Sequence, residues 1–209
     1  LIDLFSQPGK INPEILALER EAMRKVRIPR NRREQWGAQE SRLSRAEIME
    51  KLNRENLLPA ITFIFSRMGC DAAVKQCLTA GLKLTNTEER AEILATASRY
   101  TANLPEEDLE VLGYREWITA LERGIAAHHA GLLPSFKNAV EDLFQRGLVK
   151  AVFATETLAL GINMPARTVV LEKLTKWNGE AHVPITPGEY TQLTGRAGRR
   201  GIDIEGNAV

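Results

Sequence analysis

The sequence predicts an α/β fold in which a parallel β-sheet carries helices on both faces. Three short segments, 61–65, 149–153 and 168–171, are apolar at most positions and rich in branched or aromatic residues. Strands of this kind are buried on both faces, which is typical of parallel sheets. Helical stretches separate these segments, and the alternation of strands with helices predicts that the strands are parallel.

Capping signals mark where several helices begin. Ser44 with Glu47, Thr85 with Glu88, and Thr186 with Glu189 have the spacing of capping boxes. Glycine and proline end the helical patterns, because neither residue continues a helix readily. These signals predict helices over 44–58, 85–100, 105–111, 114–122 and 134–146, and one more helix that ends at Gly81. A further short strand is expected over 124–127.

Residues 1–43 differ in character from the rest of the chain. Between Arg20 and Arg33, seven basic residues accompany one acidic residue, and Pro29 interrupts any helical pattern. This composition is typical of a solvated linker, with a nucleic-acid-binding arm as the alternative. We therefore expect an irregular basic segment over 1–43 and one α/β domain over 44–209, truncated at its C-terminal end.

The composition narrows the class of protein. The net charge is +1, the hydrophobic fraction is 44%, and no apolar run is long enough to span a bilayer. The two cysteines, Cys70 and Cys77, lie two turns apart on one expected helix, beyond disulfide reach and without metal-ligand spacing. We expect a cytoplasmic globular protein with buried thiols, no metal site of its own and no membrane partner.

Polar side chains follow three of the expected strands. Ser66 follows the first strand, His129 the next, and Thr155 and Thr157 the one after. Ligands of open parallel sheets gather at the carboxyl ends of the strands, so we expect a binding site along this edge. Hydroxyls and N–H groups at a helix start can hold a phosphate, although Thr155 also suits a helix cap and His129 also suits a turn.

The segment Thr186–Gly201 carries the densest set of candidate functional groups. Its spacing predicts a helix on which Gln192, Arg196 and Arg199 share one face, with glycines between them that leave room for a partner surface. The planar, permanently charged guanidinium suits the oxygens of a transferring phosphoryl group, which is the role of an arginine finger. The alternative is a solvated basic helix end.

Four separated stretches resemble, in the right order, the motifs of one protein family. FIFSRMGC, HHAGLLP, ATETLALGINMPA and QLTGRAGRRG look like motifs IV, IVa, V and VI of superfamily-two helicases. The resemblance is closest to the superkiller-type DExH-box branch, which includes exosome-associated RNA helicases and bacterial HelY-type enzymes. It covers about Leu58–Val209 and implies the RecA-like fold of a P-loop NTPase, as in the second of a helicase's two RecA-like domains.

The resemblance implies a nucleotide site shared between two domains. Gln192, Arg196 and Arg199 would be the catalytic set, facing the phosphates of ATP across the cleft between two RecA-like domains. Gly161 and Asn163 would lie beside the nucleotide and couple it to the surface that binds nucleic acid.

The resemblance also implies a binding surface for single-stranded nucleic acid. Ser66, Thr155 and Thr157 would hold the backbone without reading bases, and His129 is a further candidate contact. RNA is favoured over DNA by the resemblance, and unwinding from 3′ to 5′ is the habit of the family.

Two motifs that such an enzyme needs do not occur in the sequence. There is no GxxxxGK[ST] phosphate loop, since Gly9 and Lys10 are followed by Ile11, and there is no DExH-type segment for magnesium. Both belong to the first RecA-like domain, which we expect to be the partner that holds Mg²⁺ with ATP. We therefore expect an ATP-dependent RNA helicase as the full-length protein, and no measurable ATP hydrolysis by this chain alone. The alternatives are a DNA repair helicase and a non-catalytic nucleic-acid-binding module.

Overall fold

The structure, a computed structural model, consists of two compact units, Leu1–Leu43 and Ser44–Val209. The first unit contains two short antiparallel strands, and a helical stretch at 13–17 follows them. These strands are β1 (Phe5–Gln7) and β2 (Lys10–Ile11). Across both units, the residues that the structure describes are 5–7, 10–17, 20, 43–160 and 164–209.

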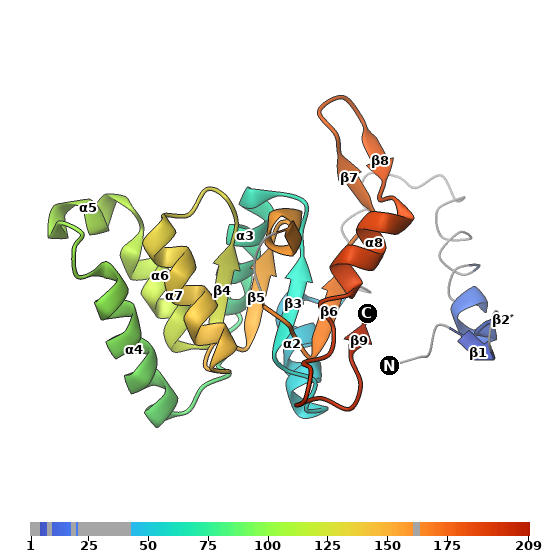
Figure 1. Cartoon of the computed structure of the whole chain (residues 1–209), viewed down its shortest axis with the longest axis horizontal. Coiled ribbons are helices and arrows are strands. Elements are labelled where there is room, and N and C mark those ends of the chain that lie inside the picture. Colours follow the sequence, from blue (N-terminus) through green and yellow to red (C-terminus); the bar gives the residue numbers. More distant parts are fainter. Residues whose placement is uncertain (1–4, 8–9, 18–19, 21–42, 161–163) are drawn as a thin grey trace, which may run out of the picture. The chain divides into compact units, whose positions relative to one another are not determined.

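The second unit is built on a five-stranded sheet in the order β4-β5-β3-β6-β9, and all neighbouring strands are parallel (Figure 1). The predicted parallel α/β fold is therefore confirmed. The strands are β3 (Ala60–Phe63), β4 (Ile125–His128), β5 (Ala151–Ala154), β6 (Thr168–Leu171) and β9 (Asn207–Ala208). The helices are α2 (Arg45–Arg54), α3 (Arg67–Thr79), α4 (Thr87–Thr101), α5 (Glu106–Val111), α6 (Tyr114–Glu122), α7 (Pro134–Gln145), α8 (Pro187–Thr194) and the 3₁₀ helix η2 (Glu156–Leu160).

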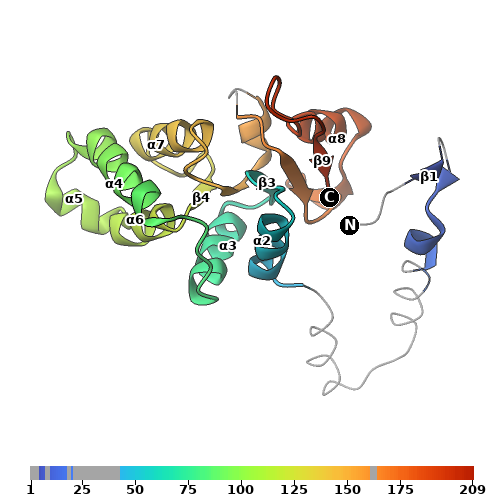
Figure 2. The same cartoon turned by 90° about the horizontal axis from the view of Figure 1, so that it is seen from below.

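Helices cover both faces of the sheet, because side chains of the central strands alternate between two apolar clusters. Ile61 and Phe63 pack in one cluster with α4, α6, α7 and α8, whereas Ala60 and Ile64 pack in the other with α2 and α3. Figure 2 shows α2 and α3 on one side of the sheet and α7 and α8 on the other. The expected burial of the strands on both faces is confirmed.

Both cysteines are buried in α3 as free thiols, as expected. Burial raises the pKa of Cys70 to about 12 and that of Cys77 to about 11, so both thiols stay protonated at neutral pH. Of the helices in the described residues, none has the length and apolar character needed to cross a membrane.

The capping boxes of α2 and α8 are confirmed, whereas that of α4 lies one residue later than predicted. Asn86 caps α4, because its side-chain oxygen accepts from the N–H of Glu89 at 2.8 Å and the Glu89 carboxylate accepts from the N–H of Asn86 at 2.9 Å. Thr85 instead donates its hydroxyl to the carbonyl of Glu122 in α6. The prediction was wrong because a long-range bond to Glu122 takes the hydroxyl that the local pattern assigned to the cap.

A hairpin that the sequence did not predict follows β6 and projects past the carboxyl ends of the sheet strands (Figure 1). Its strands are β7 (Thr175–Trp177) and β8 (His182–Pro184), paired antiparallel. In the reverse turn between them, the side-chain oxygen of Asn178 accepts from the N–H groups of Glu180 and Ala181. The strands themselves gave no apolar signal, because their outer residues are exposed on both strands.

Candidate functional site

A bidentate ion pair joins Arg199 to Asp203. Nε and Nη2 of Arg199 each donate to one carboxylate oxygen at 2.8 Å, and the backbone N–H of Arg199 donates to the same carboxylate at 2.9 Å. The side chain of Asp203 is only 3% exposed. Hydrogen bonds from Arg199 lower the pKa of Asp203, and the same bonds raise the pKa of Arg199. Both groups are therefore charged, and each fixes the orientation of the other.

This ion pair leaves one edge of the guanidinium for a ligand. A guanidinium carries five N–H donors in a planar fork. Asp203 accepts from Nε and Nη2, so the Nη1 edge of Arg199 is turned away from the carboxylate. An arginine held in this way presents parallel N–H donors in a fixed direction, which suits a pair of phosphate oxygens.

The spacing of Gln192, Arg196 and Arg199 predicted that they share one face of a helix. This prediction was wrong. α8 ends before Arg196, and only Gln192 lies within it. The backbone then leaves the helical path because it pairs with Ala166: the N–H of Ala166 donates to the carbonyl of Arg196 at 2.9 Å, and the N–H of Gly198 donates to the carbonyl of Ala166 at 2.7 Å. This bridge between Ala166 and Ala197, which are 31 positions apart in the sequence, overrides the helical pattern.

Two glycines, Gly198 in this segment and Gly206 beyond it, are required by the fold, and their role in leaving room for a partner surface stays a prediction. Gly198 has a φ of +90°, which favours glycine. A Cβ added to Gly206 would lie 2.4 Å from the carbonyl carbon of Ala197, so two backbone segments touch here. This close approach closes the turn in which Asp203 meets Arg199.

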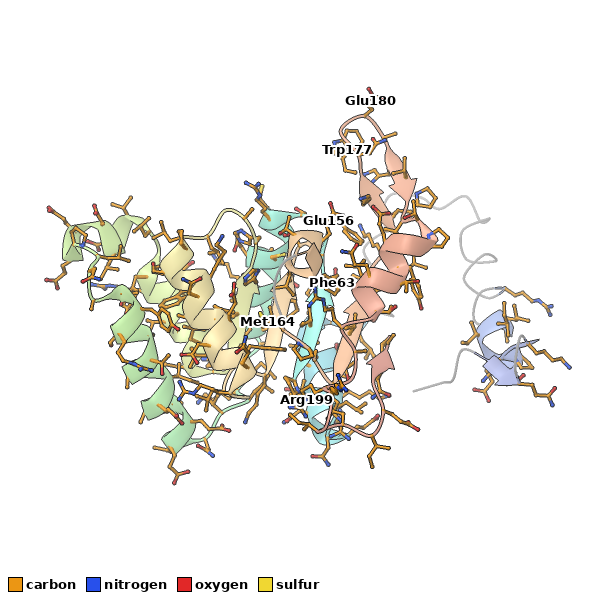
Figure 3. All side chains as sticks on the ribbon, in the orientation of Figure 1. Phe63, Glu156, Met164, Trp177, Glu180 and Arg199 are labelled. Carbon is orange, nitrogen blue, oxygen red and sulfur yellow. The ribbon has the colours of Figure 1, made fainter. Side chains whose placement is uncertain are left out.

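Arg199 lies at the amino ends of the strands, whereas we expected the chemistry to gather at the carboxyl edge. Arg167, just before β6, donates its N–H to the carbonyl of Pro59, just before β3, and Nε of Arg167 lies 3.9 Å from the Asp203 carboxylate. Figure 3 shows Arg199 and Glu156 toward opposite ends of the sheet. The expectation failed because α8 runs back along the strands: its eight residues span about 12 Å and a four-residue strand spans about 13 Å.

The hydroxyl groups of Ser66, Thr155 and Thr157 lie at the carboxyl edge, after the adjacent strands β3 and β5. The hydroxyl of Ser66 caps α3 by accepting from the N–H of Gly69 at 3.2 Å, and the hydroxyls of Thr155 and Thr157 lie 2.9 Å apart. A hydroxyl has one donor and two acceptor positions, so both arrangements leave an O–H hydrogen for another acceptor. The fold brings these groups to one edge, and their contact with nucleic acid stays a prediction.

His129 lies on the same edge, but its ring is engaged within the protein. Its Nδ1 accepts from the N–H of Gly131 at 3.1 Å, so Nε2 carries the hydrogen and donates to the carboxylate of Asp71 at 2.9 Å. The neighbouring His128 is buried against Glu141, and this burial lowers its pKa. The contacts of His129 fix the loop after β4 to α3, and its contact with nucleic acid stays a prediction.

One stretch of chain, the β5–β6 connection (residues 155–167), joins the two edges. It starts at the carboxyl edge, where the N–H of Thr155 donates to the carbonyl of His128, and it ends at the amino edge, where Ala166 pairs with the Arg196 segment. Gly161 and Asn163, the residues predicted to lie beside a nucleotide, belong to this connection and lie outside the described residues.

Two functional candidates, Trp177 and Asp203, were missed at the sequence level. Trp177 is 55% exposed on the hairpin, and its ring meets that of His182 edge-on with centroids 5.3 Å apart. It borders a groove of about 500 Å³ at the carboxyl edge, which Phe65 and Ser66 also line. An isolated tryptophan among polar residues was the available signal for the hairpin, and the i,i+4 spacing of Arg199 and Asp203 was the signal for the ion pair.

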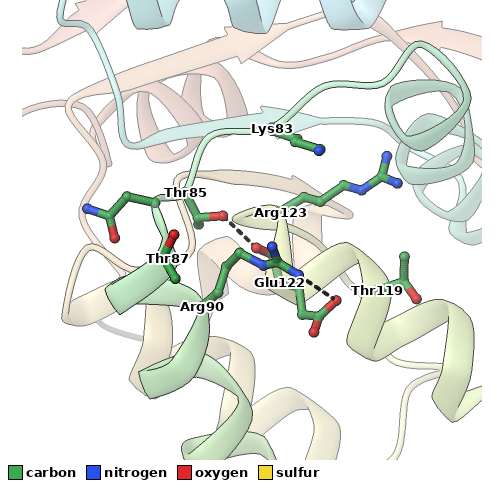
Figure 4. A pocket seen from close by; sticks show the side chains of 8 residues that line it. Lys83, Thr85, Thr87, Arg90, Thr119, Glu122 and Arg123 are labelled. Atoms are coloured by element: carbon green, nitrogen blue, oxygen red, sulfur yellow. Dashed lines mark hydrogen bonds and ion pairs between the residues drawn. The ribbon is translucent and has the colours of Figure 1, made fainter.

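A second cavity, of about 240 Å³, lies at the start of α4 and is lined by basic and hydroxyl side chains (Figure 4). Two of its basic side chains are used internally: Arg90 lies 3.8 Å from the carboxylate of Glu122, and Arg123 donates to the carbonyl of Leu78 at 2.9 Å. Both guanidinium groups of this cavity are therefore engaged within the protein. In the part of the chain that the structure describes, no group of three or more histidine, cysteine or carboxylate side chains is arranged to hold a metal ion.

Comparison with known proteins gives a consistent result. A family model described as the helicase conserved C-terminal domain matches residues 72–201. The chain is 57% identical to the protein named "Probable helicase HelY" in Mycobacterium leprae, over 100% of this chain and 24% of that protein. It is 49% identical to the DExH-box ATP-dependent RNA helicase DExH15 chloroplastic of Arabidopsis thaliana, over 76% of this chain and 13% of that protein. It is 39% identical to the Antiviral helicase SKI2 of Saccharomyces cerevisiae, over 78% of this chain and 12% of that protein. The chain thus spans a quarter or less of these relatives.

Replacing Asp203 by asparagine should lower the free energy of unfolding by about 1.5–3 kcal/mol at neutral pH, because hydrogen bonds to a charged group are lost. The pKa of Asp203 is lowered in the folded state, so its stabilisation is complete above about pH 4, its unfolded value, and is lost as the pH falls through the folded value. Urea unfolding of the wild type and D203N from pH 7 to pH 3 should therefore show a difference that shrinks below about pH 4. Glu205→Gln, at an exposed site nearby, is the control, and equal stability of D203N and E205Q at pH 7 would contradict the assignment.

Proposed function

Since the chain belongs to the family of helicase conserved C-terminal domains, we propose that it is the second RecA-like domain of an ATP-dependent RNA helicase of the superkiller type. One observation carries the proposal: an arginine oriented by a buried carboxylate lies at one edge of the sheet, and a single connection joins it to hydroxyl groups at the other edge. The first edge suits a nucleotide and the second suits a nucleic-acid backbone.

Arg199 is the arginine finger in this proposal. Its Nη1 edge faces away from Asp203 and donates to the oxygens of the terminal phosphoryl group of ATP, whose negative charge is spread over those oxygens as the group leaves. Arg196 and Gln192, before it in the chain, complete the polar set around the phosphates. Gly161 and Asn163 lie beside the nucleotide in this scheme.

The first RecA-like domain supplies the phosphate loop and the magnesium ligands in this proposal. An Arg199 fork held by Asp203 fits a polyphosphate, which supports ATP as the bound nucleotide. Mg²⁺ would be held by carboxylates of the first domain and would neutralise phosphate charge there.

The carboxyl edge holds single-stranded nucleic acid in this proposal. Ser66 and Thr157, both exposed, donate their hydroxyl hydrogens to phosphate oxygens, and Thr155 orients the hydroxyl of Thr157. Contacts of this kind follow the spacing of phosphates and carry no sequence information. Trp177, beside the groove, offers a face on which a base can stack.

The β5–β6 connection couples the two edges. When the Arg199 segment moves with the state of the nucleotide, its backbone pairing with Ala166 carries that movement into the connection, whose other end holds Thr155 and Thr157. Alternate closing and opening of the cleft between the two RecA-like domains then moves the strand-holding groups along the nucleic acid.

Replacing Arg199 by alanine in the full-length protein should lower the rate of ATP hydrolysis by about 10³–10⁵-fold, the usual contribution of an arginine finger. The matched control is Arg200→Ala, which removes an exposed arginine next in the chain and should leave the rate close to that of the wild type. Steady-state ATPase rates measure both, with the isolated 209-residue chain as a baseline that should hydrolyse none. Near-normal turnover by R199A would remove Arg199 from the catalytic set.

Single-stranded RNA should stimulate the ATPase of the full-length protein more than DNA of the same sequence and length. The relative from Arabidopsis thaliana is named an ATP-dependent RNA helicase, which supports RNA as the polymer. The comparison needs one fixed salt concentration, because binding to phosphates varies steeply with salt. Stronger stimulation by DNA would favour the alternative of a DNA helicase of the same build.

Replacing Trp177 by alanine should weaken the binding of single-stranded RNA by about 1–3 kcal/mol, the usual contribution of one stacked base. Fluorescence anisotropy of a labelled oligonucleotide on the full-length protein measures this change. The control is Tyr190→Ala, which removes an exposed aromatic side chain from α8. Equal affinities of W177A and Y190A would show that Trp177 does not stack on a base.

A further inference from the structure

Lys176, in the middle of β7, contacts two carboxylates from different parts of the chain. Its Nζ lies 2.5 Å from Oε1 of Glu189 in α8 and 3.1 Å from Oε2 of Glu156 in η2. The side chain of Lys176 is 21% exposed, and those of Glu189 and Glu156 are 33% and 45% exposed. The hairpin is thus joined by one cation to both of the elements that the proposed mechanism uses.

Each carboxylate belongs to a functional segment. Glu156 lies between Thr155 and Thr157, at the start of the β5–β6 connection. Glu189 lies in the first turn of α8, the helix that leads to the Arg199 segment, and its Oε2 accepts from the N–H of Thr186 at 2.8 Å. The two oxygens of Glu189 therefore have different tasks: Oε2 caps α8, and Oε1 holds Lys176.

The ammonium group is what allows the two carboxylates to approach one another. Glu156 and Glu189 repel each other once the cation between them is removed, because like charges at short range are unfavourable. The hydrogen bond from Lys176 is also the main reason that the pKa of Glu189 is lowered to about 2. Partly exposed ion pairs contribute little to stability. We therefore assign these three side chains the role of fixing β7, η2 and α8 relative to one another.

We propose that Lys176 is a positioning residue that couples the β7–β8 hairpin to the β5–β6 connection and to α8, so that movement driven by the nucleotide reaches the hairpin. This inference rests on the proposed function. Lys176 touches neither the nucleotide nor the reacting atoms in this scheme, so its loss affects the use of ATP hydrolysis rather than hydrolysis itself.

The test uses the full-length protein and a duplex with a single-stranded overhang, and it measures base pairs unwound per ATP hydrolysed. Lys176→Met should keep the ATPase rate without nucleic acid close to that of the wild type and lower unwinding per ATP by at least about fivefold, the low end of typical coupling between sites. Lys75→Met is the control, because it removes an exposed positive charge from α3 that forms no ion pair among the described residues. Lys176→Arg should retain most of the coupling, which excludes a folding defect at this site.

A double-variant cycle identifies the partner. Glu156→Gln should lower unwinding per ATP as Lys176→Met does, and the two changes together should be no worse than either alone. Equal unwinding per ATP for K176M and K75M, or additive losses in the double variant, would overturn the inference. If nucleic acid did not stimulate the ATPase of the wild-type protein, the proposed function itself would be contradicted. Failure of the inference about Lys176 and failure of the proposed function are therefore distinguishable.

Discussion

The burial of the central sheet on both faces is the constraint on which the rest of the structure depends. Four-residue strands with apolar side chains on alternate faces must be covered twice, so the chain crosses from one edge of the sheet to the other between successive strands. Each crossing places a loop at one edge or the other. The polar groups of those loops are separated by the length of a strand, about 13 Å for four residues.

This separation explains why one small domain can present two different chemistries. The hydroxyls of Ser66, Thr155 and Thr157 lie after adjacent strands. Neutral hydrogen-bond donors of this kind suit the regularly spaced phosphates of a nucleic-acid backbone. The guanidinium of Arg199 lies at the other end, beside the buried carboxylate of Asp203. Under the proposed function the two sets contact different phosphates, and the β5–β6 connection, which pairs through its backbone with the Arg196 segment, links them without direct contact of their side chains.

The fold was largely predictable from the sequence, because continuous apolar runs and capping residues are local signals. All four long strands and the caps of α2 and α8 followed from them. The errors came where distant contacts decide the outcome: Thr85 bonds to Glu122 instead of capping, and Ala166 draws the Arg196 segment out of its helix. The candidate site was predicted by residue type but not by place, since no local pattern reveals that α8 returns the arginines to the amino edge.

The last strand, β9, shows where the C-terminal boundary of this domain can be placed. Asn207 donates its N–H to the carbonyl of Arg167, and Val209 donates its N–H to the carbonyl of Val169. The segment after the arginines is therefore hydrogen-bonded to β6. Asp203 lies between that anchor and the guanidinium that it orients. A shortened version of the protein that stopped after Gly201 would contain the whole arginine motif, QLTGRAGRRG, yet it would lack the carboxylate of Asp203 that orients Arg199. Boundaries drawn from motifs alone therefore cut this domain too early.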